Sequence, residues 1–110
     1  MGFGRTVRKM REAKGLTIAQ FAKKVGMSPT YLAPIEREVF PPPAEPKVIK
    51  IAKALGEDPD EFLALAGRIS PDLIRIIHKK PRSTARLLRA ISRMKAKDVE
   101  AIAARAEKKR

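Results

Sequence analysis

The chain has 110 residues, of which 25 are basic and 12 acidic, so its formal net charge at pH 7 is +13. It contains no cysteine and a single histidine, His78, which excludes disulfides, thiolate metal sites and histidine clusters for a metal. No apolar run approaches the ~20 residues of a membrane span, and the N-terminus lacks a signal-peptide core. We therefore expect a cytoplasmic protein that has a polyanion as its partner.

The first part of the chain predicts two consecutive short helices. The first covers about residues 4–14 and stops at Gly15, and its apolar face consists of Phe3, Val7 and Met10. The second starts at Thr17, which forms a capping box with Gln20, and stops at Gly26, where glycine tolerates a left-handed backbone. Its buried stripe is predicted to consist of Ile18, Phe21, Ala22 and Val25.

A third helix is predicted at about residues 28–37, directly after the turn that contains Gly26. Ser28 is a good N-cap, and Pro29 suits the first helical position. Leu32 and Ile35 are predicted to be buried. The residues predicted to point away from the bundle are Thr30, Tyr31 and Pro34. Because helices this short cannot bury their faces alone, flanking segments must complete a bundle.

A stiff connector separates these helices from the next two. Residues 40–46 contain three consecutive prolines, which cannot enter a helix interior. A fourth helix at about residues 45–55 is predicted to bury Val48, Ile51, Ala52 and Leu55. A fifth helix, between Pro59 and Gly67, is predicted to bury Phe62, Leu63 and Leu65. The acidic cluster at its start, Asp58, Asp60 and Glu61, suits the helix dipole and does not indicate a metal site.

Residues 68–110 read as a basic helical extension. Ser70 and Pro71 begin a helix that is too apolar to lie free in water, since it carries Leu73, Ile74, Ile76 and Ile77. Pro81 ends this helix and opens another, whose apolar stripe is Leu87, Leu88, Ile91 and Met94. A last helix is predicted from about Ala96. The extension has fourteen basic and four acidic residues, so it holds most of the excess charge.

Residues 3–67 together resemble the Cro-like helix-turn-helix family of bacterial and phage regulators, also called the xenobiotic-response-element family. The residues that carry the resemblance are RKMR (8–11), KGLT (14–17), FA (21–22), GMS (26–28), YL (31–32), IER (35–37), IAKALG (51–56) and AG (66–67). The resemblance implies an all-α fold, with a five-helix bundle at residues 1–67 and a helical extension at 68–110. It also implies that the third helix enters the major groove of double-stranded DNA and that a dimer binds a roughly palindromic operator.

The same resemblance implies DNA contacts at the starts of the second and third helices. Amides near Thr17 would meet a phosphate, although an ordinary helix cap without a ligand is the alternative. The third helix carries no Arg, Lys, Asn or Gln before Arg37, and Pro34 departs from the family pattern. We therefore expect modest base discrimination, supplemented by DNA shape. The candidate DNA-binding residues are Thr17, Gln20, Ser28, Pro29, Thr30, Tyr31, Pro34 and Arg37.

Two further charged sets have structural as well as functional interpretations. Arg11 and Glu36 stand where family members often form a partly buried ion pair, so we expect this pair to lock the bundle. Four arginines at intervals of four, three and four form one basic helical face, namely Arg82, Arg86, Arg89 and Arg93. Three interpretations of this face remain open. It could be the solvated side of a dimerisation helix, a second phosphate-binding surface, or a binding site for an acidic partner.

The leading hypothesis is a homodimeric, sequence-specific transcriptional regulator that represses by covering a promoter. No catalytic grouping or phosphate-binding glycine loop is present in the sequence, so we expect no enzymatic activity, cofactor or metal. Three alternatives remain open. They are an antitoxin that clamps a toxin through Leu73–Ile102, a protein-interaction module that never meets DNA, and a largely non-specific architectural DNA-binding protein.

Overall fold

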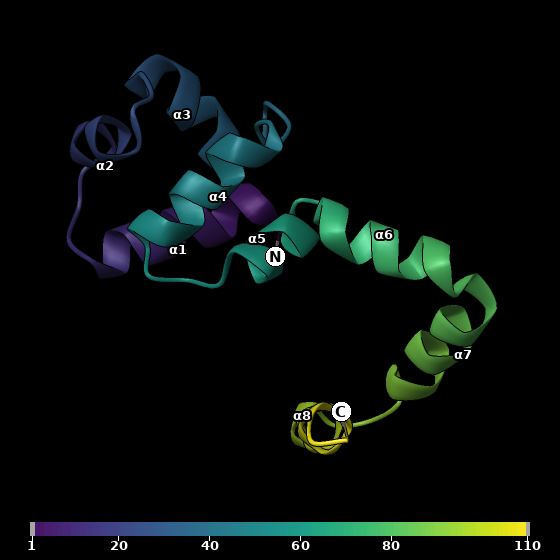
Figure 1. Cartoon of the computed structure of the whole chain (residues 1–110). Helices are drawn as coiled ribbons and strands as arrows, with labels where there is room; N and C mark the ends of the chain where they lie inside the picture. Colours follow the sequence, from purple (N-terminus) through teal and green to yellow (C-terminus); the bar gives the residue numbers. More distant parts are fainter. Residues whose placement is uncertain (1, 110) are drawn as a thin grey trace. The chain divides into compact units, whose positions relative to one another are not determined.

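The computed structural model describes residues 2–109, which form eight α-helices and no strand. The chain divides into two compact units, Met1–Ser70 and Pro71–Arg110. The first unit contains α1 (Phe3–Ala13), α2 (Ile18–Val25), α3 (Pro29–Glu36), α4 (Glu45–Ala54) and α5 (Pro59–Leu65) (Figure 1). The second contains α6 (Pro71–Lys79), α7 (Pro81–Ile91) and α8 (Ala96–Glu107). The predicted all-α fold, a five-helix bundle with a helical extension, is confirmed.

The first unit has one apolar core to which all five of its helices contribute. Phe3 of α1 and Phe62 of α5 meet edge to face, with their ring centroids 6.0 Å apart. Each fully buried Val, Leu, Ile or Phe side chain contributes roughly 1.5–3 kcal/mol. The buried apolar residues are Phe3, Val7, Phe21, Ala22, Val25, Leu32, Ile35, Val48, Ile51, Ala52, Leu55, Phe62 and Leu63.

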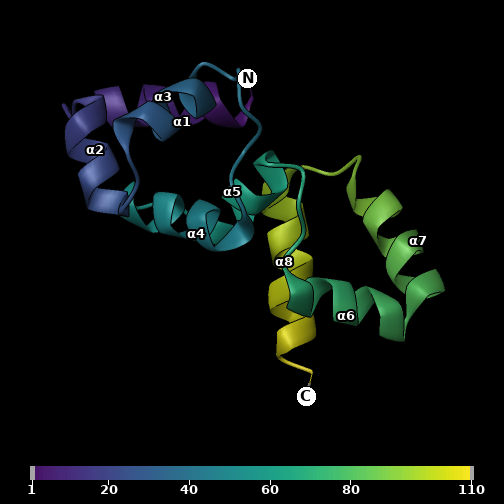
Figure 2. The same cartoon turned by 90° about the horizontal axis from the view of Figure 1, so that it is seen from above.

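Within this unit, α3 packs against α1 and α2, whereas α4 packs against α2 and α5. Figure 2 shows α2 across one end of the unit, between the pair α1 and α3 and the pair α4 and α5. Gly4 permits the close approach of α1 to α3, because a β-carbon there would overlap the backbone carbonyl oxygen of Ile35. The position of α3 therefore depends on its contacts with the first two helices.

Main-chain carbonyls hold the proline connector between α3 and α4. The amides of Val39 and Phe40 donate to the carbonyl oxygen of Pro34, at 2.9 and 3.2 Å. The Arg68 guanidinium, which follows α5, donates to the carbonyl oxygens of Pro42 and Pro43. The connector is therefore fixed at both ends, although it has no regular secondary structure of its own.

The prediction that Leu65 is buried is wrong, since this side chain is 37% exposed. Leu65 is the last residue of α5 and lies two positions after the buried Leu63. Residues two apart on a helix point to nearly opposite sides, because successive residues turn by about 100°. Leu63 takes the inward position, so Leu65 faces outward.

The second unit has no buried side chain in any of its three helices. α6 packs against α7. Large apolar side chains of this unit stay 37–55% exposed, namely Leu73, Ile74, Ile76, Leu87, Leu88, Ile102 and, between α7 and α8, Met94. The helices of the extension are thus amphipathic, with apolar faces that the described residues cover only in part.

Candidate nucleic-acid interface

Side-chain caps define where α2 and α3 begin. The Thr17 hydroxyl accepts a hydrogen bond from the Gln20 amide at 3.1 Å, and the Gln20 side chain accepts one from the Thr17 amide at 2.9 Å. Gly26 ends α2 with a left-handed φ of 70°. The Ser28 hydroxyl accepts from the Tyr31 amide at 3.1 Å and caps α3. The predicted capping box, glycine stop and serine cap are all confirmed.

Most of the candidate DNA-binding residues lie on the surface of the first unit. The exposed ones are Thr17, Gln20, Ser28, Pro29, Thr30 and Arg37. Leu32 and Ile35, on the other side of α3, are almost completely buried. The first turn of α3 is therefore presented to solvent while the rest of the helix is anchored in the core.

Tyr31 does not point away from the bundle as predicted, because it is half-buried against the core. Its ring lies 6.5 Å from the ring of Phe40, and the Lys47 ammonium lies 4.8 Å from its centroid. Phe40 belongs to the proline connector and Lys47 to α4. A cation over an aromatic face is attracted by the ring quadrupole, so Tyr31 is held on the side that faces α4.

Pro34 is half-buried as well, so it is less accessible than the other predicted outward residue, Thr30. α3 continues through Pro34 as far as Glu36. The proline has no amide to donate, yet its carbonyl accepts from both Val39 and Phe40. The Pro34 carbonyl thereby anchors the turn into the connector.

The predicted ion pair between α1 and α3 is confirmed. The Arg11 guanidinium donates to the Glu36 carboxylate at 2.8 and 2.9 Å, and both residues are buried. This hydrogen bonding raises the pKa of Arg11 above its ordinary value, so the guanidinium stays charged at neutral pH. Neither side chain is available to read DNA, which agrees with a structural role.

A groove of about 280 Å³ lies beside the end of α3. It is lined by Arg8, Arg11, Ile18, Ala33, Glu36 and Arg37. Arg37 therefore lies on the same side of the unit as Ile18, the first residue of α2. Arg8 is a groove cation that the sequence analysis missed. Its position three residues before Arg11 on α1 places the two on neighbouring faces, and this spacing is the signal that could have identified it.

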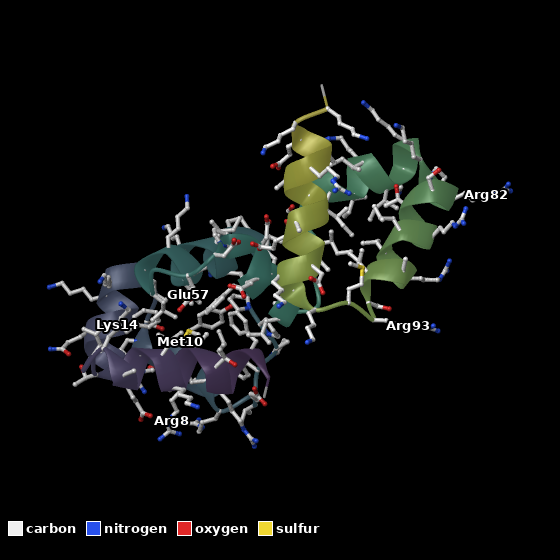
Figure 3. The ribbon with its side chains drawn as sticks, turned by 90° about the horizontal axis from the view of Figure 1, so that it is seen from below. Arg8, Met10, Lys14, Glu57, Arg82 and Arg93 are labelled. Carbon is white, nitrogen blue, oxygen red and sulfur yellow. The ribbon has the colours of Figure 1, made fainter. Side chains whose placement is uncertain are left out.

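The four arginines of the extension occupy exposed positions on α7 or directly after it. Arg82, Arg86 and Arg89 belong to α7, and Arg93 follows its end. Figure 3 shows the labelled Arg82 and Arg93 extending away from α8. None of the four takes part in an ion pair with another residue between 2 and 109. Arg82, Arg86 and Arg89 therefore share one helix at the predicted spacing, whereas Arg93 lies in the turn after it.

Two other kinds of site are not found in the described part of the chain. No group of His, Asp and Glu residues there could hold a metal ion. None of the helices between residues 2 and 109 has the length and apolar character that a membrane crossing needs.

The comparisons with known proteins agree with this geometry. A family model described as helix-turn-helix matches residues 7–62. Two similar solved structures are regulators. One is SinR, the master regulator for biofilm formation, in complex with DNA, with 26% identity over 56% of this chain and 97% of that chain and a TM-score of 0.52. The other is the clp gene regulator ClgR from Corynebacterium glutamicum, with 28% identity over 59% and 83% and a TM-score of 0.50.

A third structure shares the fold over a greater length. The SinR/SinI protein complex covers 96% of this chain and 94% of that chain, with a TM-score of 0.55 and 17% identity. At this identity the likeness concerns the fold alone. Among curated proteins, none matches this chain.

Proposed function

Because this chain belongs to the helix-turn-helix family and is a DNA-binding transcriptional regulator, we propose that it recognises one operator as a homodimer and represses transcription by covering a promoter. One observation carries the proposal. The first turn of α3, with Ser28 and Thr30, is exposed, whereas Leu32 and Ile35 anchor the helix in the core. An α-helix fits the major groove, and the N-terminal residues of a recognition helix reach the base edges there.

Phosphate contacts would position the unit on the duplex. The N-terminus of α2 carries the positive end of the helix dipole and amides that no helical carbonyl satisfies. Arg37 is exposed and lines the same groove as Ile18. A phosphate placed near Thr17 and Gln20 would meet both the amides and a guanidinium. Such contacts fix the register of a protein on DNA but carry no sequence information.

Base reading would rest on a small set of side chains. Thr30 offers a hydroxyl or a methyl group to a base, and the exposed Ser28 and Pro29 lie beside it. Tyr31 and Pro34 are half-buried, so we expect them to contact DNA only at the edge of the major groove. Since α3 has no forked donor or acceptor of the kind that best separates bases, we expect modest specificity, increased by DNA shape.

The extension would join two copies of the chain. Its exposed apolar side chains gain about 25 cal/mol for each Å² that a second copy covers. In such a dimer, the α3 helices of the two copies would bind half-sites about one DNA turn apart. The same exposed apolar side chains support a second candidate, in which another protein covers these helices. The mass of the purified protein alone in solution distinguishes the two.

Selection of bound duplexes from a random pool, at about 0.15 M salt, tests the proposed function. The expected product is a palindrome with half-sites about one helical turn apart. Thr30→Val should abolish the preference at one base pair of each half-site, whereas the control Glu61→Gln on α5 should retain it. If the selected duplexes share no preferred sequence and the protein still binds them tightly, this result would contradict operator recognition and support the architectural alternative.

A further inference from the structure

The cationic charge of this protein is concentrated outside the helix-turn-helix unit. Residues 1–67 carry eleven basic and eight acidic side chains, a net charge of +3. Residues 73–97, by contrast, hold nine basic and no acidic residues within twenty-five positions. Phosphate neutralisation supplies most of the non-specific affinity of DNA-binding proteins. A unit with so little net charge is a weak source of that affinity by itself.

Four of these cations form what we call the arginine stripe, which consists of Arg82, Arg86, Arg89 and Arg93. Helical geometry places Arg82, Arg86 and Arg89 within about 60° of arc and along about 10.5 Å of the axis of α7. Arg93 lies two residues after the end of this helix. Leu87 and Ile91 fall on the opposite side of the same helix by the same geometry. The apolar side can therefore bind a second copy of the chain while the arginine stripe stays free.

The arginine stripe has no anion of its own within the described chain. All four residues are exposed, and no carboxylate among residues 2–109 forms an ion pair with any of them. Like charges three and four residues apart on a helix repel one another. An external polyanion removes this repulsion, so binding one is favourable for the helix itself.

The residues beside the arginine stripe indicate which polyanion fits. By helical geometry its flanks are formed by Ser83, Ala85, Ala90 and Ser92, all of them small. A protein partner is usually held by large side chains that fill pockets, and these flanks offer none. Short flanks instead allow a smooth, regularly charged backbone to approach closely. All four cations are arginines, whose planar forks bind phosphate through two hydrogen bonds at once.

We propose that the arginine stripe binds the phosphate backbone of duplex DNA and is a second DNA-binding surface of this regulator. The proposal rests on the proposed function, because α3 would already hold the duplex and raise its effective concentration at the extension. The arginine stripe contacts phosphates only, so it adds affinity without base preference. It thereby compensates for the small net positive charge of the helix-turn-helix unit.

The salt dependence of DNA binding by the full chain tests this assignment. The probe is a mixed-sequence duplex several helical turns long, and the variant carries Arg→Gln at positions 82, 86, 89 and 93. Each lost phosphate contact makes the negative slope of log K against log salt shallower by about 0.9, so the magnitude of the slope should fall by about 3.6. Over a fourfold rise in salt, the wild-type protein should lose about 150-fold more affinity than the variant.

A matched control separates the arginine stripe from net charge in general. Gln at Lys95, Lys97, Arg105 and Lys108, on and around α8, removes the same four charges from the same unit. This control should keep a slope close to that of the wild-type protein. Arg→Lys at the four stripe positions should keep the slope too, but with weaker binding, because ammonium groups lack the fork. Circular dichroism would verify that all variants stay helical.

Equal slopes for the two Gln variants would overturn the proposal, since any loss of charge would then have the same effect. An unchanged slope in the stripe variant would also overturn it and would favour an acidic protein as the occupant. If the base preference set by Thr30 persists in either case, the proposed function stands and only the second surface fails. A wild-type chain that binds no duplex at all would contradict both.

Discussion

Glu36, the last residue of α3, accepts hydrogen bonds from Nε and Nη2 of Arg11 on α1, at 2.8 and 2.9 Å. The remaining nitrogen of the guanidinium, Nη1, donates to the carbonyl oxygen of Leu16 at 2.7 Å. One buried side chain thus joins α1, the loop before α2 and the end of α3. This arrangement holds the rear of α3 while the first turn of the helix remains exposed.

Arg11→Met should destabilise the protein by about 3–5 kcal/mol, because it leaves the Glu36 carboxylate buried and unpaired. Arg11→Met combined with Glu36→Leu should recover much of this loss. Urea unfolding monitored by circular dichroism measures both. Arg8→Met is the control, since Arg8 makes only an exposed pair with Glu12 and should cost less than about 1 kcal/mol. A loss for Arg11→Met as small as that of the control would contradict the structural role of the pair.

Gly4→Ala should destabilise the first unit, although alanine normally stabilises a helix interior by about 0.5–1 kcal/mol relative to glycine. The added β-carbon would overlap the Ile35 carbonyl and lie 2.9 Å from Cγ of Glu38, so α1 and α3 must separate. Overpacking of this kind typically costs about 1–3 kcal/mol. Thermal unfolding measures the change. An increase in melting temperature would show that the two helices are not in close contact at Gly4.

Ser28→Asp should separate stability from DNA binding. An aspartate still caps α3 and suits its dipole, so the free energy of unfolding should remain close to that of the wild-type protein. A negative charge at the first turn of α3 would repel phosphates, so affinity for duplex DNA should fall. Ala64→Asp, on the exposed side of α5, adds the same charge elsewhere and should reduce affinity much less. Equal losses for the two variants would count against a DNA contact at Ser28.

Ile76→Gln combined with Leu87→Gln should weaken dimerisation at least about tenfold, which corresponds to about 1.4 kcal/mol. These side chains of α6 and α7 are 55% and 53% exposed and are proposed to be covered by a second copy. Sedimentation equilibrium gives the dissociation constant. The control is Val39→Gln, which changes an apolar side chain of the first unit that is 67% exposed. A wild-type protein that stays monomeric at high concentration would favour a different protein partner for these helices.

The local signals in the sequence were sufficient to place the helices. Thr17 and Gln20 form the capping box that they predict, and Ser28 and Pro29 open α3. Such signals act within one turn of helix, so the nearby residues determine them completely. The pairing of Arg11 with Glu36 came from the family resemblance, since no local rule connects positions twenty-five residues apart.

The sequence did not predict features that depend on the tertiary arrangement. Tyr31 turns toward the bundle because Phe40 and Lys47 lie beside it, and both come from later segments whose placement no local pattern specifies. Leu65 was assigned to the core by its apolar character, yet its position relative to Leu63 directs it outward. Arg8 lines the groove because α1, α2 and α3 pack together, and the groove itself is not visible in the sequence of any one helix.

Site-directed cross-linking to DNA tests most directly whether the start of α3 enters the major groove. The chain has no native cysteine, so Thr30→Cys introduces a single thiol at the proposed contact. With a selected duplex that carries a thiol tether on a major-groove base edge, Thr30→Cys should form a disulfide with the DNA, and the control Glu61→Cys on α5 should form none. A duplex that binds both variants tightly but cross-links to neither, or to both equally, would show that the start of α3 does not enter the major groove.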